Sequence, residues 1–311
     1  MSRTAKNPLE VVLSGNGRKL TLQNPIMTAS GTFGFGFEFE PYGDLNTLGG
    51  IVVKGLSLEE RDGNPMPRIA DSPAGMLNCI GLQNPGAKVF LKGLLPRLAS
   101  LKAKIIPNLY ATSVDEFAEL AAMLSVEGVG ALEVNVSCPN VRDGGTAFGH
   151  DPIMAAKVTE AVVKNTSLPV IVKLSPNVTD ITIIGKACEN AGATALSCIN
   201  TVRGMAVDIV RRKSFLSNVI GGLSGPAIKP VGLRCVWEVT RAVNIPVIGL
   251  GGITSVEDAL EYMLVGATAV QVGTGNFIRP DMAFQMVADL PAALEKYRIT
   301  SLADFRGSLQ V

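Results

Sequence analysis

Eight short apolar segments, spread along the whole chain, restrict the possible folds more than any other feature of the sequence. They lack the regular alternation of polar and apolar residues, which is typical of strands covered on both faces. Most of them are separated by segments with helix-start signals, such as Ser113 three residues before Glu116, or Asp151 followed by Pro152. The segments cover residues 25–29, 50–54, 104–109, 131–136, 170–174, 195–200, 247–250 and 269–272.

The joints between helices and strands also repeat. A helix end, a glycine turn and the next strand recur in similar sequence at residues 127–134, 190–197 and 265–272. The eight strand segments, most of them followed by a helix and several linked by this joint, predict an α/β fold. The predicted fold is a single (β/α)8 TIM barrel with residues 1–311 as one domain. An open doubly wound sheet is the alternative, and the lack of a G-x-G-x-x-G motif after the first strand counts against it. The long connections at 55–103 and 201–245 are interpreted as insertions over the C-terminal mouth of the barrel.

Composition argues against several classes of function. The chain has 28 basic and 27 acidic residues, so it carries no electrostatic footprint for nucleic acid. No apolar stretch reaches the roughly 20 residues of a membrane span, and the run at 9–13 is too short for a secretory signal. The five cysteines include no C-x-x-C pair, and no cluster has metal-ligand spacing. We therefore expect a soluble, cytoplasmic protein that binds no metal, membrane or nucleic acid, and no iron–sulfur cluster on this chain.

Polar residues and glycines gather where the predicted strands end, which is where a barrel of this type has its active site. Two apolar segments end in lysine, and a buried lysine is costly unless it is paired. Lys54 and Lys173 are therefore candidate site residues, with solvated strand ends as the alternative. Glycines after the last two strands (Gly251, Gly252, Gly273) let backbone N–H groups approach an anion and predict a phosphate site. Tight turns without a ligand are the alternative there.

The segment from Glu133 to Asn140 reads E-V-N-V-S-C-P-N and places a thiol at the end of a predicted strand. The strand must stop here because Pro139 has no N–H for the ladder. Cys138 is therefore a candidate catalytic residue, with a buried structural cysteine as the alternative. His150 is the only histidine, so a Ser-His-Asp or Cys-His-Asp arrangement would depend on one residue beside a helix cap. The other four cysteines (Cys79, Cys188, Cys198, Cys235) are interpreted as packing residues.

Ten ordered motifs across nearly the whole chain resemble the dihydroorotate dehydrogenase family. The resemblance implies an FMN-binding (β/α)8 barrel, a flavoprotein oxidoreductase that converts (S)-dihydroorotate to orotate in pyrimidine (UMP) biosynthesis. It implies that Cys138 removes the C5 proton while hydride passes from C6 to FMN, and that loop 141–149 covers the substrate. The motifs lie at residues 29–34, 53–55, 63–68, 76–86, 135–140, 172–177, 199–201, 221–226, 251–252 and 273–274.

The same resemblance implies the ligand contacts. Lys54 and Lys173 would lie near the flavin, where a cation favours the anionic reduced form. Tyr110 with Ala111, and Cys79, depart from the family pattern, and Cys79 would place a second thiol near the substrate. The implied substrate residues are Lys54, Asn78, Cys79, Ile80, Gly81, Leu82, Asn135, Asn140, Asn200 and Thr201. The implied FMN residues are Ser30, Lys54, Gly55, Asn108, Asn135, Lys173, Ile199, Gly225, Gly251, Gly252, Gly273 and Thr274.

The resemblance also implies a partner. Cysteine at position 138, without an N-terminal helical extension, is similar to the soluble class of the family, since the membrane-associated class has serine there. Residues 63–68 and 76–86 resemble the NAD-linked kind, in which a homodimeric core joins an electron-transfer subunit carrying FAD and a 2Fe–2S cluster. The expected assembly is a heterotetramer of two plus two chains with NAD as acceptor.

Several alternatives to this function stay open at this stage. A fumarate-linked homodimer belongs to the same soluble class, and a reductase of free pyrimidines shares much of the site. A phosphate-binding aldolase or synthase that forms a Schiff base on Lys54 or Lys173, and a non-catalytic scaffold, come from other classes.

Overall fold

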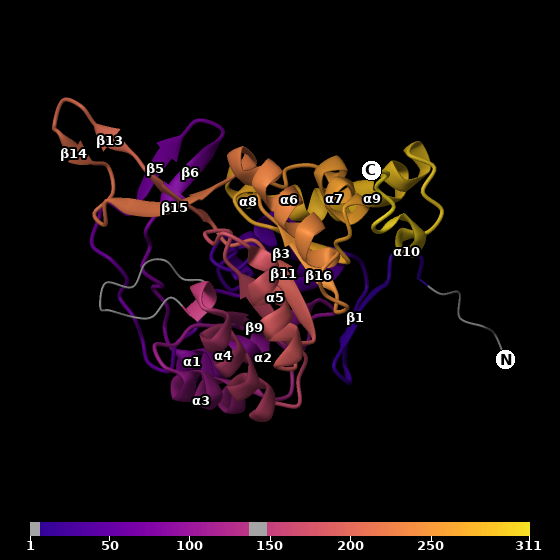
Figure 1. Ribbon diagram of the computed structural model, residues 1–311, viewed down its shortest axis with the longest axis horizontal. Helices are drawn as coiled ribbons and strands as arrows, with labels where there is room; N and C mark the ends of the chain where they lie inside the picture. Colours follow the sequence, from indigo (N-terminus) through magenta and orange to yellow (C-terminus); the bar gives the residue numbers. More distant parts are fainter. Residues whose placement is uncertain (1–6, 137–147) are drawn as a thin grey trace.

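The central feature of the fold is a parallel sheet that closes on itself. The computed structural model describes residues 7–136 and 148–311 (Figure 1). Neighbouring strands follow the order β7-β4-β3-β17-β16-β11-β10-β9-β8. The strands are β3 (Ile26–Thr28), β4 (Gly50–Val52), β7 (Lys104–Ile106), β8 (Asn108–Leu109), β9 (Leu132–Asn135), β10 (Val170–Leu174), β11 (Ala195–Cys198), β16 (Val247–Leu250) and β17 (Ala269–Val272).

The ring of strands closes around Pro107. β7 pairs with β4 on one side, and β8 pairs with β9 on the other. Pro107 lies between β7 and β8 and has no N–H for a neighbouring strand, so it interrupts the ladder inside one predicted segment. Each of the eight apolar segments thus forms a barrel strand, or the two pieces of one. The predicted (β/α)8 barrel is confirmed, and the open doubly wound sheet is excluded.

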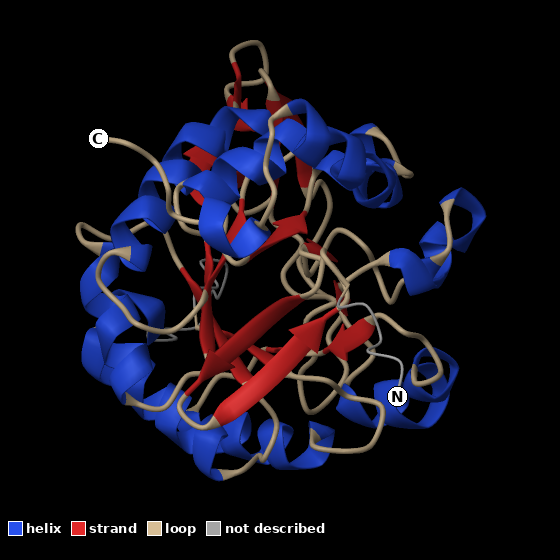
Figure 2. Ribbon diagram, turned by 90° about the vertical axis from the view of Figure 1, so that its right-hand side faces the viewer, coloured by secondary structure: helices blue, strands red, loops and turns tan. Residues whose placement is uncertain are grey.

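Helices surround the strands (Figure 2). Several start where the sequence signals them: Ser113 accepts a hydrogen bond from the N–H of Glu116, and Asp151 accepts one from the N–H of Ile153. The α-helices are α1 (Ala87–Val89), α2 (Leu95–Leu98), α3 (Val114–Leu124), α4 (Pro152–Lys164), α5 (Ile181–Asn190), α6 (Lys229–Thr240), α7 (Val256–Leu264), α8 (Gly275–Ile278), α9 (Met282–Lys296) and α10 (Leu302–Phe305). Single turns of other helix types are η1 (Phe37–Tyr42), η2 (Leu45–Thr47), η3 (Phe90–Leu94), η4 (Phe148–His150) and η5 (Pro226–Ile228).

An antiparallel hairpin closes the N-terminal end of the barrel. Its strands are β1 (Val11–Gly15) and β2 (Arg18–Leu22). Leu13 and Leu22 are fully buried and belong to one apolar cluster with side chains of the barrel strands, including Ile106, Ile171 and Ile248. The hairpin reaches the chain just before β11, since Asn16 donates a hydrogen bond to the carbonyl of Ala193. Only the opposite, C-terminal end of the barrel can therefore admit a ligand.

The two long insertions meet over that C-terminal end in a second sheet, which we call the mouth sheet. It contains β5 (Ile69–Ser72) and β6 (Gly75–Asn78) from the first insertion and β12 (Val202–Met205) and β15 (Ile220–Ser224) from the second, in the order β12-β15-β6-β5. All its pairings are antiparallel. A hairpin of β13 (Val207–Asp208) and β14 (Lys213–Ser214) projects away from it, at the upper left of Figure 1. The predicted insertions over the mouth are confirmed.

None of the helices in the described part of the chain is both long enough and apolar enough to cross a membrane. The assignment of residues 1–311 to a single domain stays a prediction.

Candidate active site

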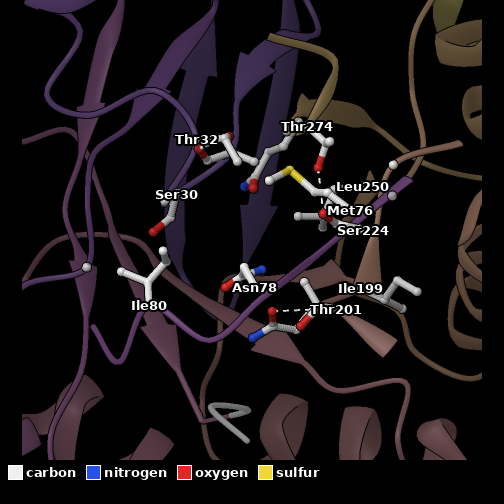
Figure 3. Close-up of a pocket in the computed structure, with 18 of the residues that line it drawn as sticks. Ser30, Thr32, Met76, Asn78, Ile80, Ile199, Thr201, Ser224, Leu250 and Thr274 are labelled. Atoms are coloured by element: carbon white, nitrogen blue, oxygen red, sulfur yellow. Dashed lines mark hydrogen bonds between the residues drawn. The ribbon is translucent and has the colours of Figure 1, made fainter. Parts of the chain in front are cut away.

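A pocket opens between the C-terminal ends of the barrel strands and the mouth sheet (Figure 3). Ser30 and Thr32 enter it from the loop after β3, and Asn78 and Ile80 enter from the end of β6. Most of the predicted site residues meet here, although they lie far apart in the sequence. Those that line the pocket are Ser30, Lys54, Gly55, Asn78, Ile80, Gly81, Leu82, Asn135, Lys173, Ile199, Asn200, Thr201, Gly225, Gly251, Gly252, Gly273 and Thr274.

Two predicted residues in the described part of the chain, Asn108 and Cys79, are not part of this lining. Asn108 is buried next to the pocket wall, with its Oδ1 only 3.0 Å from where a Cβ on Gly55 would lie. Cys79 is turned away into a small apolar cluster with Leu77, and its Sγ lies 3.7 Å from Ser217 Oγ. The structure thus does not bring a second thiol into the pocket. Cys138 and Asn140, together with residues 141–147 of the predicted covering loop, lie outside the described residues.

Five polar side chains from five of the barrel strands form a buried layer inside the barrel. The carboxylate of Glu133 (β9) is fully buried at its centre. Its Oε1 accepts a hydrogen bond from Asn108 Nδ2 (β8) at 2.7 Å. Its Oε2 accepts from Ser197 Oγ (β11) at 3.0 Å and from Gln271 Nε2 (β17) at 2.8 Å. We call Glu133, Asn108, Lys173, Ser197 and Gln271 the polar layer.

Lys173 on β10 supplies the positive charge of this layer. Its side chain is only 7% exposed, and its Nζ lies 3.9 Å from Glu133 Oε1. The strand register places Lys173 between Asn135 and Ser197, so all three side chains point into the barrel. Lys173 also lines the pocket, so its ammonium lies between the buried carboxylate and the open space above. The solvated strand end considered for Lys173 is excluded.

Lys54 stands at the pocket wall in a different electrostatic setting. Burial, and then the nearby positive charge of Arg68, lower the pKa of the Lys54 ammonium. Among the described residues it forms no ion pair. A largely desolvated cation without a counterion favours an anionic ligand, because the anion would restore the lost electrostatic stabilisation.

Glycines form a cradle at the opposite side of the pocket. Gly252 has a φ of 71°, and a Cβ there would lie 2.8 Å from the backbone N of Lys229 and 2.9 Å from the carbonyl O of Gly225. A side chain at position 252 would therefore be strained and would clash. Nearby, Thr274 donates a hydrogen bond from Oγ1 to Ser224 Oγ at 2.7 Å, as Figure 3 shows. Glycines at such positions allow a ligand such as a phosphate to approach the backbone closely.

Amide side chains at the pocket edge hold one another in place. Asn200 Oδ1 accepts a hydrogen bond from the N–H of Thr201 at 2.8 Å, and its Nδ2 donates to Asn135 Oδ1 at 3.4 Å. Asn78 on β6 donates to the carbonyl of Gly222 at 3.3 Å, which fixes it against the mouth sheet. These contacts orient the amides of Asn78, Asn135 and Asn200 around the same space.

The remaining described cysteines have no part in the pocket. Cys188, Cys198 and Cys235 are buried, and burial raises the pKa of each thiol, in Cys188 to about 12. Such thiols stay protonated at neutral pH and behave as small apolar groups. Within the described ranges, no group of three or more His, Cys, Asp or Glu side chains is arranged to hold a metal ion.

Several residues of the site were not among those predicted from the sequence. The most important of them are Glu133 and Gln271. The sequence gives an indication of both, because each places a long polar side chain within a short, mainly apolar strand whose neighbouring residues are buried. A polar residue in such a place needs a buried partner. The other missed lining residues are mostly small or apolar: Ala29, Gly31, Thr32, Ile69, Met76, Ser224, Ile228, Leu250 and Phe277.

Comparison with known proteins gives one consistent result. The family model described as dihydroorotate dehydrogenase matches residues 12–294. Two curated relatives, both named dihydroorotate dehydrogenase B (NAD(+)), catalytic subunit, come from Maridesulfovibrio salexigens and Solidesulfovibrio magneticus. They are 63% and 64% identical to this chain, over 94% of its length and 96% of theirs.

A third relative of the same name, from Geotalea daltonii, is 52% identical over 99% of this chain and 100% of its own. Among solved structures, the dihydroorotate dehydrogenase of Eimeria tenella in complex with ferulenol has a TM-score of 0.78 at 20% identity. That match covers 99% of this chain and 90% of the other. At this level of identity, the structural match shows the shared fold.

Proposed function

The chain belongs to the dihydroorotate dehydrogenase family, and from this premise we propose that the pocket at its barrel mouth binds FMN and (S)-dihydroorotate. Its activity is the oxidation of dihydroorotate to orotate in pyrimidine biosynthesis. The observation that carries the proposal is the convergence of a buried Lys173–Glu133 pair, a second desolvated lysine and a glycine cradle in one pocket. A cation, oriented amides and an anion site together suit a flavin phosphate and a carboxylated pyrimidine.

The residues present fit FMN. Asn108 Oδ1 and Gln271 Oε1 are buried beside the pocket and have no hydrogen-bond partner in the described part of the chain. Buried polar atoms without partners are rare in native proteins, and a ligand that donates hydrogen bonds would satisfy them. Lys173 would contact the isoalloxazine ring, and Gly251, Gly252, Gly273 and Thr274 would hold the phosphate. When bound, FMN supplies the hydride acceptor.

The substrate would be held by residues at the pocket rim. Amides from Asn78, Asn135 and Asn200 can donate to and accept from a ring with two carbonyls and two N–H groups. Lys54 would pair with the substrate carboxylate, which would relieve the electrostatic cost of its burial. Ile80, Gly81, Leu82 and Thr201 complete this wall.

Cys138 would act as the base that removes the C5 proton. The proposal rests on the family motif and on chain connectivity, since Cys138 follows three residues after Asn135, which lines the pocket. Three extended residues reach about 10 Å, so the thiol is tethered close to the pocket. A thiolate near a lysine is stabilised, because a neighbouring cation lowers a thiol pKa. Asn140 and loop 141–149 would contact and cover the substrate.

Electrons would leave through a partner chain. The relatives are named as NAD(+)-linked catalytic subunits, which favours an electron-transfer subunit with FAD and a 2Fe–2S cluster over the fumarate-linked kind. We place two such subunits on a homodimer of this chain, in the cytoplasm. The projecting hairpin supports a protein partner, because Ile209 and Val210 are 85% and 88% exposed there, close to exposed Met205 and Phe215.

An anaerobic absorbance spectrum tests the cofactor, substrate and base together. The purified chain, reconstituted with FMN, should show a flavin spectrum that bleaches when dihydroorotate is added. Cys138→Ala should keep the flavin spectrum and bleach about 10²- to 10⁴-fold more slowly, which is the usual contribution of general-base catalysis. Cys235→Ala, which removes a buried thiol on α6, serves as the matched control and should bleach at the wild-type rate. Fast bleaching of Cys138→Ala would contradict the role of this thiol.

A second assay addresses the partner. The isolated chain should reduce NAD hardly at all with dihydroorotate, and addition of the iron–sulfur flavoprotein subunit should restore the reaction. Brisk NAD reduction by this chain alone would contradict the two-subunit route.

A further inference from the structure

The fully buried carboxylate of Glu133 pairs with Lys173 but has no assigned role toward the ligand. It lies at the centre of the polar layer, where four side chains from four other strands point at it. We propose that Glu133 is a positioning residue: it fixes the orientation of the Asn108 and Gln271 amides, so that their oxygens face the ligand as hydrogen-bond acceptors. This proposal rests on the proposed FMN site. It identifies Glu133 as the residue that decides whether the two amides present acceptors or donors to the ligand.

An ionised carboxylate has only acceptor sites, so each amide that contacts it must turn its NH2 group toward it. Asn108 does so through Nδ2 at 2.7 Å, and Gln271 does so through Nε2 at 2.8 Å. The oxygen of a planar amide then points the other way. Glu133 therefore determines which end of each amide faces away from it.

The two oxygens turned away from Glu133 are the unpartnered ones. Asn108 Oδ1 and Gln271 Oε1 are both buried and lack a hydrogen-bond partner among residues 7–136 and 148–311. The Asn108 oxygen points at Gly55 of the pocket wall, and Gln271 itself lines the pocket. Gln271 therefore offers an acceptor at the pocket lining, and Asn108 offers a second one at the wall beside Gly55. FMN presents matching donors, namely the N3–H of its ring and the hydroxyls of its ribityl chain.

Glu133 also balances the charge of Lys173. With Nζ 3.9 Å from Oε1 and a side chain 7% exposed, Lys173 would otherwise be a buried cation without a counterion. The charges of Glu133 and Lys173 therefore offset each other. Loss of its negative charge would leave the Lys173 cation uncompensated, and a cation there favours the electron-rich reduced flavin.

Glu133→Gln tests the proposal, because glutamine has nearly the same shape but brings an NH2 group of its own. That NH2 needs an acceptor, so one neighbouring amide has to turn over and present its own NH2 to the ligand. The affinities of FMN and of an analogue with carbon in place of N3, which lacks one donor, are measured for both proteins. The wild type should prefer FMN by about tenfold, the size expected for one buried hydrogen bond, and the variant by about threefold or less.

The midpoint potential of the bound FMN provides a second readout. It should be more positive in Glu133→Gln than in the wild type, because the variant leaves the Lys173 charge uncompensated. Ser197→Ala is the matched control: it removes one hydrogen bond to the same carboxylate and leaves both amides oriented. It should keep the wild-type preference for FMN and the wild-type potential.

A merely structural role of Glu133 predicts a different result. Both affinities would then fall by the same factor, which would overturn the proposal. Equal effects of Ser197→Ala and Glu133→Gln would overturn it as well. If Glu133→Gln does not fold, the wild type still decides, since equal affinity for FMN and the analogue contradicts acceptor oxygens that face the ligand. Failure of the wild type to bind FMN at all would instead refute the proposed function.

Discussion

The two ends of the barrel interior are built from the same strands but differ in polarity: the closed end is apolar and the open end is polar. In β10, Ile171 belongs to the apolar cluster at the closed end, and Lys173, two residues later, belongs to the polar layer. β17 shows the same change: Ala269 belongs to the apolar cluster at the closed end, and Gln271 belongs to the polar layer. Two residues along a strand keep a side chain on the same face and move it up by about 7 Å. One strand thus contributes packing at its start and chemistry at its end.

The two ends also differ in what stabilises them. At the closed end, the β1–β2 hairpin covers the apolar side chains, and their removal from water favours the folded state. At the open end, burial of Glu133 and Lys173 costs free energy that their mutual contacts only partly offset. We therefore expect substitutions at the closed end to change stability, and substitutions at the open end to change ligand binding.

Leu13→Ala should give the largest effect on stability. Leu13 is fully buried in the hairpin that closes the barrel, and a leucine-to-alanine change in such a place costs about 2–5 kcal/mol. Unfolding in urea should show this loss, while the FMN affinity of the folded protein should stay within about twofold of wild type, as expected for additive distant sites. A large loss of FMN affinity without loss of stability would break the division between the two ends.

Lys54→Met should weaken ligand binding and leave stability at neutral pH largely unchanged, which is the opposite of the result expected for Leu13→Ala. Loss of a charge-assisted contact of about 1.5–3 kcal/mol should weaken orotate binding about 10- to 100-fold at neutral pH, as measured by titration. Lys104→Met, which removes an exposed lysine at the start of β7, is the matched control and should bind orotate normally. Unchanged orotate affinity in Lys54→Met would show that this lysine does not meet the substrate carboxylate.

The pH dependence of Lys54 has a defined sign. The folded, ligand-free state lowers the pKa of this ammonium below its ordinary value of 10.5, so it binds the proton less tightly than the unfolded state does. Stability of the ligand-free wild type, relative to Lys54→Met, should therefore rise as pH increases from the lowered pKa toward 10.5. Orotate affinity should fall over the same window, because the anion needs the charged form. A relative stability that falls with pH would contradict this assignment.

Two glycine substitutions compare the ends directly. Gly252→Ala forces a side chain into a left-handed conformation beside Lys229 and should cost about 1–3 kcal/mol of stability and also weaken FMN binding. Gly15→Ala, at the closed end, places a Cβ against the carbonyl of Thr194 and should lower stability alone. Thermal unfolding and FMN titration of both variants measure the difference. Equal FMN affinities in the two variants would show that the cradle does not hold the cofactor.

Cys79→Ala should give the smallest effect. The thiol packs against Leu77 and Leu216 behind the mouth sheet, so its loss should cost no more than about 1 kcal/mol of stability. The KM for dihydroorotate should stay within about twofold of wild type, since a packing change of this size does not reach the pocket side. A clear rise in KM would place Cys79 in contact with the substrate after all.

The barrel itself was predictable because strands buried on both faces must be apolar throughout, and such segments stand out in the sequence. Most of the pocket lining was predictable as well, because polar residues and glycines at the ends of these apolar segments also stand out in the sequence. The polar layer was not predictable, since the contact between Glu133 and Gln271 spans 138 positions and depends on the strand register. The direction of the Cys79 side chain depends on pairing within the mouth sheet, which joins two insertions whose sequences give no sign of each other.

The mouth sheet has a consequence for how the enzyme is made. β6 pairs with β15, and the hydrogen bond from Asn78 to Gly222 joins residues 144 positions apart. During synthesis from the N-terminus, β6 leaves the ribosome long before its partner strand exists. The wall of the pocket is therefore completed only when the second insertion and the last two barrel strands have emerged. A ligand can therefore occupy this pocket only after nearly the whole chain has been synthesised.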